Sequence, residues 1–196
     1  MTSPLTTTVT GHVTANAEHA RRLDRLATAW RWTSDRLHAV RPHDLDRPTP
    51  CADFDLAGLL DHLAESVERF IGVLGGTVPP TAGTSPAERF ALLRVAHLSA
   101  WDAADPDGAY ELPFGLVPAW LAADLNLAEV ALHGWDIGRA TGERSDVPDE
   151  LAVPVLTIGK QLLTDDTRSG AFAPAVDIAA DAGASDRMAA WYGRPT

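Results

Sequence analysis

Two histidines and a glutamate are the residues of this chain whose types and spacing suit the binding of a divalent metal ion. Glu129 and His133 lie four positions apart, so a helix would present both side chains on one face, one turn apart. Zinc and related ions accept a carboxylate oxygen and an imidazole nitrogen as ligands. Asp136 follows on the same predicted helix, and His62 lies on another. Taken alone, the Glu129–His133 pair is explained more simply by a buried hydrogen bond without metal.

The helix predicted over residues 116–141 is apolar around most of its circumference, which is typical of a buried helix. Its polar side chains gather within an arc of roughly 80°; they are Asn126, Glu129, His133 and Asp136. Because an unpaired buried polar group is costly, this strip needs partners. His62 lies on the flank of a leucine stripe and would be an ordinary boundary histidine unless its helix meets the strip.

Apolar positions at three- and four-residue steps predict the elements that must position these side chains. The expected helices cover residues 16–40, 56–74, 85–104, 116–141 and 148–164, with a short helical stretch at 186–191. Pro42 and Gly75-Gly76 end the first two, and Ser85-Pro86-Ala87-Glu88 has the form of a capping box. No strand-period pattern is long enough to predict a sheet. We therefore predict an all-α domain over residues 16–196, a helical bundle, preceded by a flexible Thr-rich leader at 1–15.

Composition excludes several function classes. The 196 residues carry a formal net charge of −11 with a pI near 4.9, whereas nucleic-acid binders usually present a basic face. No apolar run approaches the roughly 18 residues of a membrane-spanning helix, and no secretory signal is visible. The single cysteine, Cys51, rules out an internal disulfide framework and fits a reducing compartment. We expect a cytoplasmic protein that binds neither membranes nor nucleic acid.

Three blocks of sequence resemble the DinB/YfiT-like metalloenzyme superfamily. More specifically, they are similar to the mycothiol-dependent maleylpyruvate isomerase metal-binding domain and its actinobacterial relatives. The blocks are Arg47-Pro-Thr-Pro-Cys-Ala-Asp-Phe54 with Leu59-Leu-Asp-His62-Leu63, then Val130-Ala-Leu-His-Gly-Trp-Asp-Ile-Gly-Arg-Ala-Thr-Gly142, and finally Asp186-Arg187-Met188 with Trp191-Tyr-Gly-Arg194. The resemblance covers roughly residues 18–196.

This resemblance implies a four-helix up-down-down-up bundle with an additional C-terminal helical segment and tail. It also implies one divalent metal held by His62, Glu129 and His133. Many superfamily members use three histidines, and this chain departs from that version at Glu129. Zinc is the default ion for two imidazoles and one carboxylate, with Ni²⁺, Fe²⁺ and Mn²⁺ as alternatives. Asp136 could orient His133 or bind the metal itself, and we favour the first role.

The chemistry that the resemblance implies is thiol transfer, with mycothiol as cosubstrate and a small electrophile as substrate. The expected activity is that of an S-transferase or isomerase. A non-catalytic, metal-stabilised binding module and a metal-dependent hydrolase remain as alternatives. Arg94 could bind a substrate carboxylate or phosphate, although an arginine at a core boundary that packs its stem is the simpler interpretation. A homodimer is compatible with this class of bundle.

Overall fold

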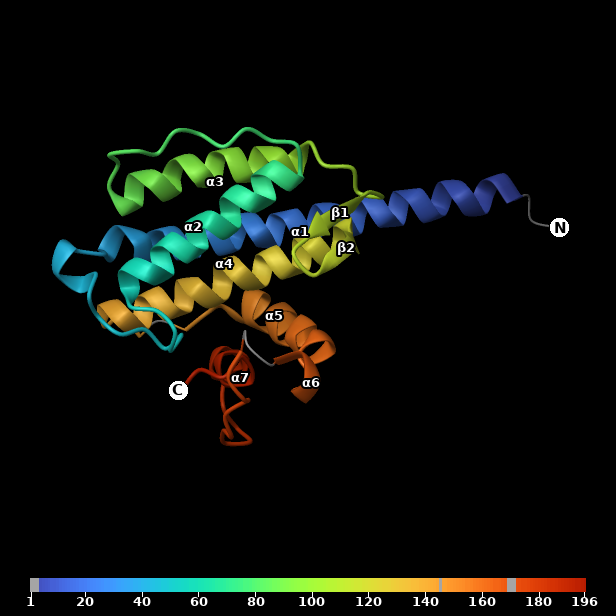
Figure 1. Cartoon of the computed structure of the whole chain (residues 1–196). Coiled ribbons are helices and arrows are strands. Elements are labelled where there is room, and N and C mark those ends of the chain that lie inside the picture. The colour runs from blue at the N-terminus through green and yellow to red at the C-terminus, as the bar shows by residue number, and fades with distance from the viewer. Residues whose placement is uncertain (1–3, 145, 169–171) are drawn as a thin grey trace.

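The computed structural model describes residues 4–144, 146–168 and 172–196 of the chain. Four long helices form its main body (Figure 1); they are α1 (Pro4–Ala39), α2 (Leu56–Val73), α3 (Pro86–Asp102) and α4 (Ala119–Thr141). Helix α1 packs against α3 and α4, and α2 packs against the same two helices. Each long helix therefore has two neighbours, and the four surround a common core. The prediction of a mostly helical protein is confirmed.

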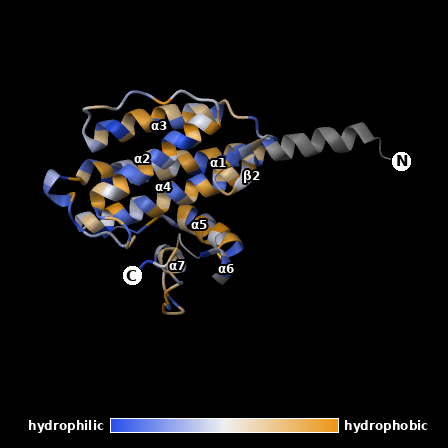
Figure 2. Ribbon diagram, viewed as in Figure 1, coloured by the Kyte–Doolittle hydropathy of each residue, from blue (hydrophilic) through white to orange (hydrophobic). Residues whose placement is uncertain are grey.

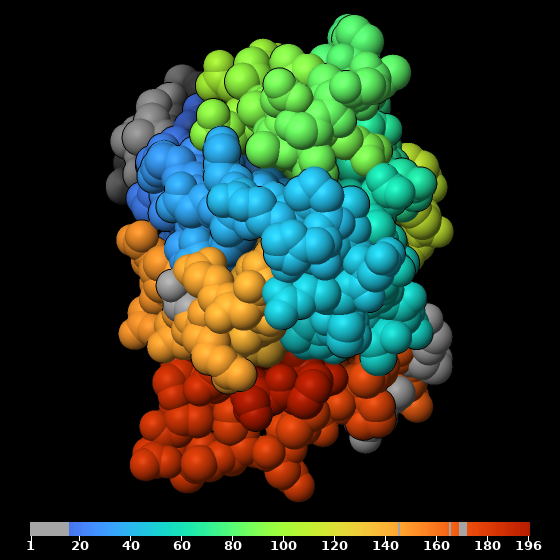
Figure 3. Space-filling model, turned by 90° about the vertical axis from the view of Figure 1, so that its left-hand side faces the viewer, coloured from blue at the N-terminus to red at the C-terminus, as the bar shows by residue number. Residues whose placement is uncertain are grey.

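The remaining elements are short. They are a 3₁₀ turn (Pro42–Asp44), strands β1 (Ala109–Leu112) and β2 (Gly115–Pro118), and helices α5 (Asp149–Leu162), α6 (Asp165–Arg168) and α7 (Ala184–Trp191). Helix α5 packs against α4 and α7 (Figure 1). In the space-filling view, the C-terminal residues form a layer directly against the end of α4 and the loop that precedes α2 (Figure 3). None of the helices in the described part of the chain is long and apolar enough to cross a membrane.

Two sequence predictions are wrong. The first helix was expected to begin at residue 16, but α1 begins at Pro4; residues 1–3 lie outside the described residues. Proline suits a first helical position, and no further proline interrupts the chain before Pro42. A β-hairpin was not expected at all. Its strands have four residues each and are joined by Pro113 and Phe114, after which Gly115 begins β2 with φ of +121°. Strands of this length are too short to show an alternating pattern. The hairpin also delays the start of α4 to Ala119.

Helix α4 is buried along most of its length, which places its polar strip inside the molecule. Gly134 allows the close approach of α1, because a Cβ there would lie 2.3 Å from the Thr33 hydroxyl. That hydroxyl donates a hydrogen bond to the carbonyl of Val130 at 3.0 Å. Hydrophobic and hydrophilic residues alternate along the ribbons of the other long helices (Figure 2). The packing of α1 thus fixes the rotation of α4 and the direction in which its polar side chains point.

Candidate metal centre

The structure brings His62, Glu129 and His133 together between α2 and α4. Each residue offers one ligand atom, and these atoms all lie within 4.8 Å of one another. The Oε1 atom of Glu129 lies 3.4 Å from Nε2 of His62 and 3.7 Å from Nε2 of His133. The two imidazole rings meet edge to face, with centroids 5.2 Å apart. We call these three residues the metal cluster, because such a group could hold one metal ion.

The three side chains of the metal cluster differ in their exposure to solvent, and that of Glu129 is 24% exposed. The side chain of His62 is 41% exposed, whereas that of His133 is 6% exposed. Phe54 stacks on the His62 ring with centroids 4.9 Å apart. Phe54 belongs to the loop before α2, whose first turn is capped by the Asp55 carboxylate through the Gly58 amide at 2.8 Å. A small molecule would therefore reach the cluster past His62, beside the Phe54 ring.

His133 is oriented from behind by Asp136. The Nδ1 atom of His133 lies 3.0 Å from Oδ2 of Asp136, whose side chain is completely buried. Because a carboxylate only accepts hydrogen bonds, we assign the imidazole proton to Nδ1. The Nε2 atom of a neutral His133 then directs a lone pair toward Glu129. This is the tautomer that a metal ligand needs.

Glu129 requires a positive charge beside it. Its Oε1 atom is buried and has no hydrogen-bond partner among the described residues. Burial raises the pKa of Glu129, but the neighbouring imidazoles of His133 and His62 lower it to about 2. The Glu129 carboxylate in turn raises the pKa of His62, against the effect of burial. The carboxylate thus favours positive charge beside it, and a divalent cation would supply that charge without a proton on His62.

The donor set suits a divalent metal ion. Two imidazole nitrogens and one carboxylate oxygen suit zinc, and nickel, iron or manganese accept the same donors. Three protein ligands leave at least one coordination position for a substrate or water, which is typical of catalytic sites. The unpartnered oxygen of Glu129 faces the two Nε2 atoms, so the residues present fit a divalent cation.

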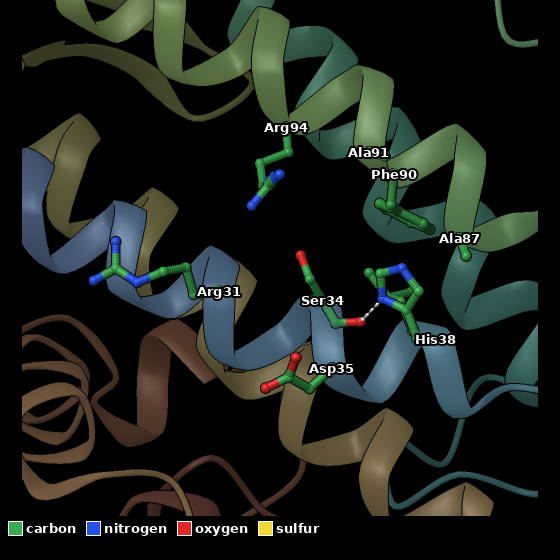
Figure 4. Close-up of a pocket in the computed structure, with 9 residues that line it drawn as sticks. Arg31, Ser34, Asp35, His38, Ala87, Phe90, Ala91 and Arg94 are labelled. Atoms are coloured by element: carbon green, nitrogen blue, oxygen red, sulfur yellow. Dashed lines mark hydrogen bonds between the residues drawn. The ribbon is translucent and has the colours of Figure 1, made fainter.

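Three other residues of interest lie outside the metal cluster. Arg94 lines a groove of about 410 Å³ between α1 and α3 (Figure 4), where its side chain points toward α1. That groove shares no lining residue with the metal cluster. Asn126 belongs to the predicted polar strip, but it contacts His97 of α3 instead. Cys51 is half-buried in the loop before α2, and burial raises the pKa of its thiol.

Arg194 also contributes to this site, and the sequence did not predict it. Its Nε atom lies 3.2 Å from Oδ1 of Asp136, and its Nη2 atom lies 3.1 Å from Oδ2. The two residues are 58 positions apart, so no local pattern connects them. The only sequence indication was the place of Arg194 in the C-terminal block of the family resemblance.

Comparison with known proteins gives relatives without a known activity. No protein-family model matches the chain, and no solved structure matches it. Two curated relatives, the uncharacterised proteins Rv0738 and MT0763 of Mycobacterium tuberculosis strains H37Rv and CDC 1551, are each 28% identical to it. The similarity spans 162 residues, which are 81% of this chain and 89% of each relative. The chain is thus distantly homologous to these mycobacterial proteins.

Proposed function

We propose that this protein is a divalent-metal-dependent enzyme of the DinB/YfiT-like superfamily, of the mycothiol-dependent maleylpyruvate isomerase type. The helix arrangement supports this assignment. In Figure 1, α1 and α4 run in one direction while α2 and α3 run in the other, as in an up-down-down-up bundle. The group that could hold the metal comes from the second and fourth helices, where the superfamily pattern has its ligands.

One observation carries the proposal. The buried Oε1 atom of Glu129 has no hydrogen-bond partner in the part of the chain that the structure describes, and it lies within 4 Å of two imidazole nitrogens. A buried carboxylate oxygen without a partner is expensive, so proteins retain one where a ligand or ion satisfies it. A divalent cation between Glu129, His62 and His133 would satisfy all three groups at once.

A divalent ion held there would lower the pKa of a thiol in its open position, so that the thiolate is available at neutral pH. The residues of the chain orient the metal ligands and shape the approach to them. Asp136 keeps the proton of His133 on Nδ1, and the Phe54 ring forms one wall of the approach. In the proposed S-transfer the thiol proton leaves to solvent, the sulfur of mycothiol forms a bond to an electrophilic carbon, and the bond from that carbon to its leaving group breaks, with the electron pair going to the leaving group. In the proposed isomerisation the sulfur adds to a carbon–carbon double bond of an activated substrate, and elimination of the same thiol after bond rotation restores the double bond. The substrates are small molecules.

The test combines metal analysis with a thiol assay. Purified protein should contain about one equivalent of zinc or a related metal by mass spectrometry, and should consume mycothiol with a panel of small electrophiles. His133→Ala should lose both properties. His43→Ala, which removes a highly exposed histidine, should keep them. The proposal would be contradicted if the purified protein held no stoichiometric metal and if chelators changed neither its fold nor its stability.

Two further outcomes would redirect the proposal. Stoichiometric metal with no turnover of any thiol would favour a non-catalytic, metal-stabilised binding module. Turnover of an ester or amide without added thiol, lost in His133→Ala, would favour a metal-dependent hydrolase that activates water at the same position.

A further inference from the structure

Arg194 is a buried arginine near the end of the chain. Its side chain contacts Asp136, the residue that holds His133 of the metal cluster. Its Nε and Nη2 atoms donate to the two oxygens of Asp136 at 3.2 and 3.1 Å. Its Nη1 atom donates to the carbonyl of Tyr192 at 3.0 Å. Arg194 is 4% exposed, and Asp136 is not exposed at all. A two-point contact of this kind fixes both the position and the plane of the carboxylate.

The same carboxylate sets the orientation of His133. Oδ2 of Asp136 accepts the Nδ1 proton of His133 at 3.0 Å, which leaves Nε2 for a metal. A buried carboxylate is costly without a paired cation, and Arg194 is the cation that pairs with Asp136. Arg194 therefore contacts Asp136, and Asp136 in turn contacts His133 of the metal cluster.

Arg194 can reach Asp136 only when the C-terminal segment is docked on the bundle. Gly193 turns the chain after α7 with φ of +78°, and a Cβ there would lie 2.7 Å from the carbonyl oxygen of Ala173. The Arg194 amide donates to the carbonyl of Ala189 at 3.0 Å, which closes this turn. Arg168 donates to the carbonyl of Trp191 at 2.7 Å. The space-filling view shows this segment against the end of α4 (Figure 3).

We infer that Arg194 is a positioning residue of the metal cluster, so that metal binding and the docking of residues 184–196 strengthen each other. The inference rests on the proposed metal site. Coupling between two binding events is reciprocal: the factor by which docking raises the metal affinity is the factor by which the metal stabilises docking. Residues that orient a metal ligand from behind typically change metal affinity about 10- to 100-fold.

The first test measures zinc affinity of the full chain by competition with a chromogenic chelator. Arg194→Gln should weaken zinc binding about 10- to 100-fold. Arg194→Lys should restore part of the loss, because lysine keeps the charge but lacks the planar fork. Arg187→Gln, on an exposed arginine of α7 in the same C-terminal segment, should bind like the parent. The absorption spectrum of the Co²⁺-loaded protein should change in Arg194→Gln and not in Arg187→Gln, because it reports ligand geometry rather than stability.

The second test needs no variant, so it holds even if Arg194→Gln fails to fold. Hydrogen exchange of the unmodified protein is measured with and without saturating Zn²⁺. Exchange over residues 184–196 should slow by about the same 10- to 100-fold factor. The inference is overturned if zinc protects the region around His62 and leaves 184–196 unchanged, or if folded Arg194→Gln binds zinc like the parent. A parent protein that binds no zinc overturns the proposed function as well, so the two failures are distinguishable.

Discussion

Two histidine clusters lie in the same bundle and use their ring nitrogens in opposite ways. The metal cluster lies between α2 and α4, and one oxygen of its Glu129 has no hydrogen-bond partner within the described ranges. The second cluster lies where α1, α3 and α4 meet; we call it the His97 cluster, and it consists of Trp30, His97, Trp101 and Asn126. Both contain a histidine and a polar side chain of α4 on the same predicted strip.

The His97 cluster is closed. The indole N–H of Trp30 donates to Nδ1 of His97 at 2.9 Å, so the imidazole proton must lie on Nε2, which donates to Oδ1 of Asn126. The indole N–H of Trp101 donates to the same oxygen at 2.7 Å. His97 is completely buried, and burial lowers its pKa to about 4. Only the amide nitrogen of Asn126 lacks a partner among the described residues, and it is a donor that cannot ligate a metal.

The two clusters differ in whether their acceptors are satisfied. Both groups are polar and lie inside the bundle, but only the metal cluster has a buried carboxylate oxygen without a hydrogen-bond partner among the described residues, and this oxygen lies beside two imidazole nitrogens. The His97 cluster needs no ion, because each ring nitrogen of His97 already has its partner. Unsatisfied acceptors, rather than the number of polar residues, make one of the two clusters a candidate metal site.

The largest expected effect separates the two clusters by metal affinity. Glu129→Gln keeps the shape of the side chain but removes the charge that a divalent ion needs. Zinc affinity should fall by more than about 100-fold, beyond the effect of residues that only orient a ligand. His97→Gln should bind zinc like the parent. Competition with a chromogenic chelator measures both. Equal losses in the two variants would show that the clusters are not functionally distinct.

The second prediction distinguishes the metal cluster from the His97 cluster by the free energy of unfolding. His97→Leu should lower the free energy of unfolding by about 3 kcal/mol, because the Trp30 indole N–H loses its buried acceptor and the Asn126 carbonyl loses one of its two donors. Zinc stoichiometry should remain at one in the folded variant. Chemical denaturation in the presence of a chelator gives the stability, and metal analysis gives the stoichiometry. A loss of zinc with unchanged stability would reverse the assignment of the two clusters.

The sequence predicted the helices because their determinants are local. Apolar spacing and end residues suffice for this, as at Ser85, whose amide donates to Glu88 at 2.9 Å in the expected capping box. The hairpin was missed because four-residue strands carry too little pattern. The start of the first helix was misjudged because residues 1–15 show no apolar stripe, although no proline after Pro4 interrupts the chain before Pro42.

The sequence of α4 alone could not predict which polar residues of the strip face α2 and which face α3. Asn126 and Glu129 lie within one arc of α4, but Asn126 meets α3 and Glu129 meets α2. Angular position on a helix does not specify which neighbour lies opposite, since that depends on how the helices are rotated and staggered. His62 was placed with the pair by family resemblance, and Arg194 was missed because tertiary packing alone brings it to Asp136.

A third prediction uses the depressed pKa of His97. The folded pKa of about 4 lies below the ordinary value of 6.5, so between these two pH values the unfolded chain binds a proton that the folded protein does not. The free energy of unfolding should therefore fall as the pH is lowered through this window, by up to about 3 kcal/mol, and this contribution should be constant above pH 6.5.

The control for this titration is His97→Gln, measured with chelator present over the same pH range. It should lack this component of the pH dependence, while both proteins keep the contribution of His62, whose raised pKa stabilises the metal-free fold at low pH instead. Parallel curves for the two proteins would mean that the proton uptake does not belong to His97.

The smallest expected effect concerns the open side of the metal cluster. Phe54→Leu removes the ring that stacks on His62 at 4.9 Å but keeps an apolar side chain in the loop before α2. The aromatic contact is worth about 1 kcal/mol, so zinc affinity should weaken about fivefold, because His62 is held less firmly. Phe90→Leu, which changes a buried aromatic residue on α3 away from this site, should leave the affinity unchanged. A loss for Phe54→Leu as large as that for Glu129→Gln would mean that the loop before α2 shapes the metal cluster itself rather than supporting one ligand.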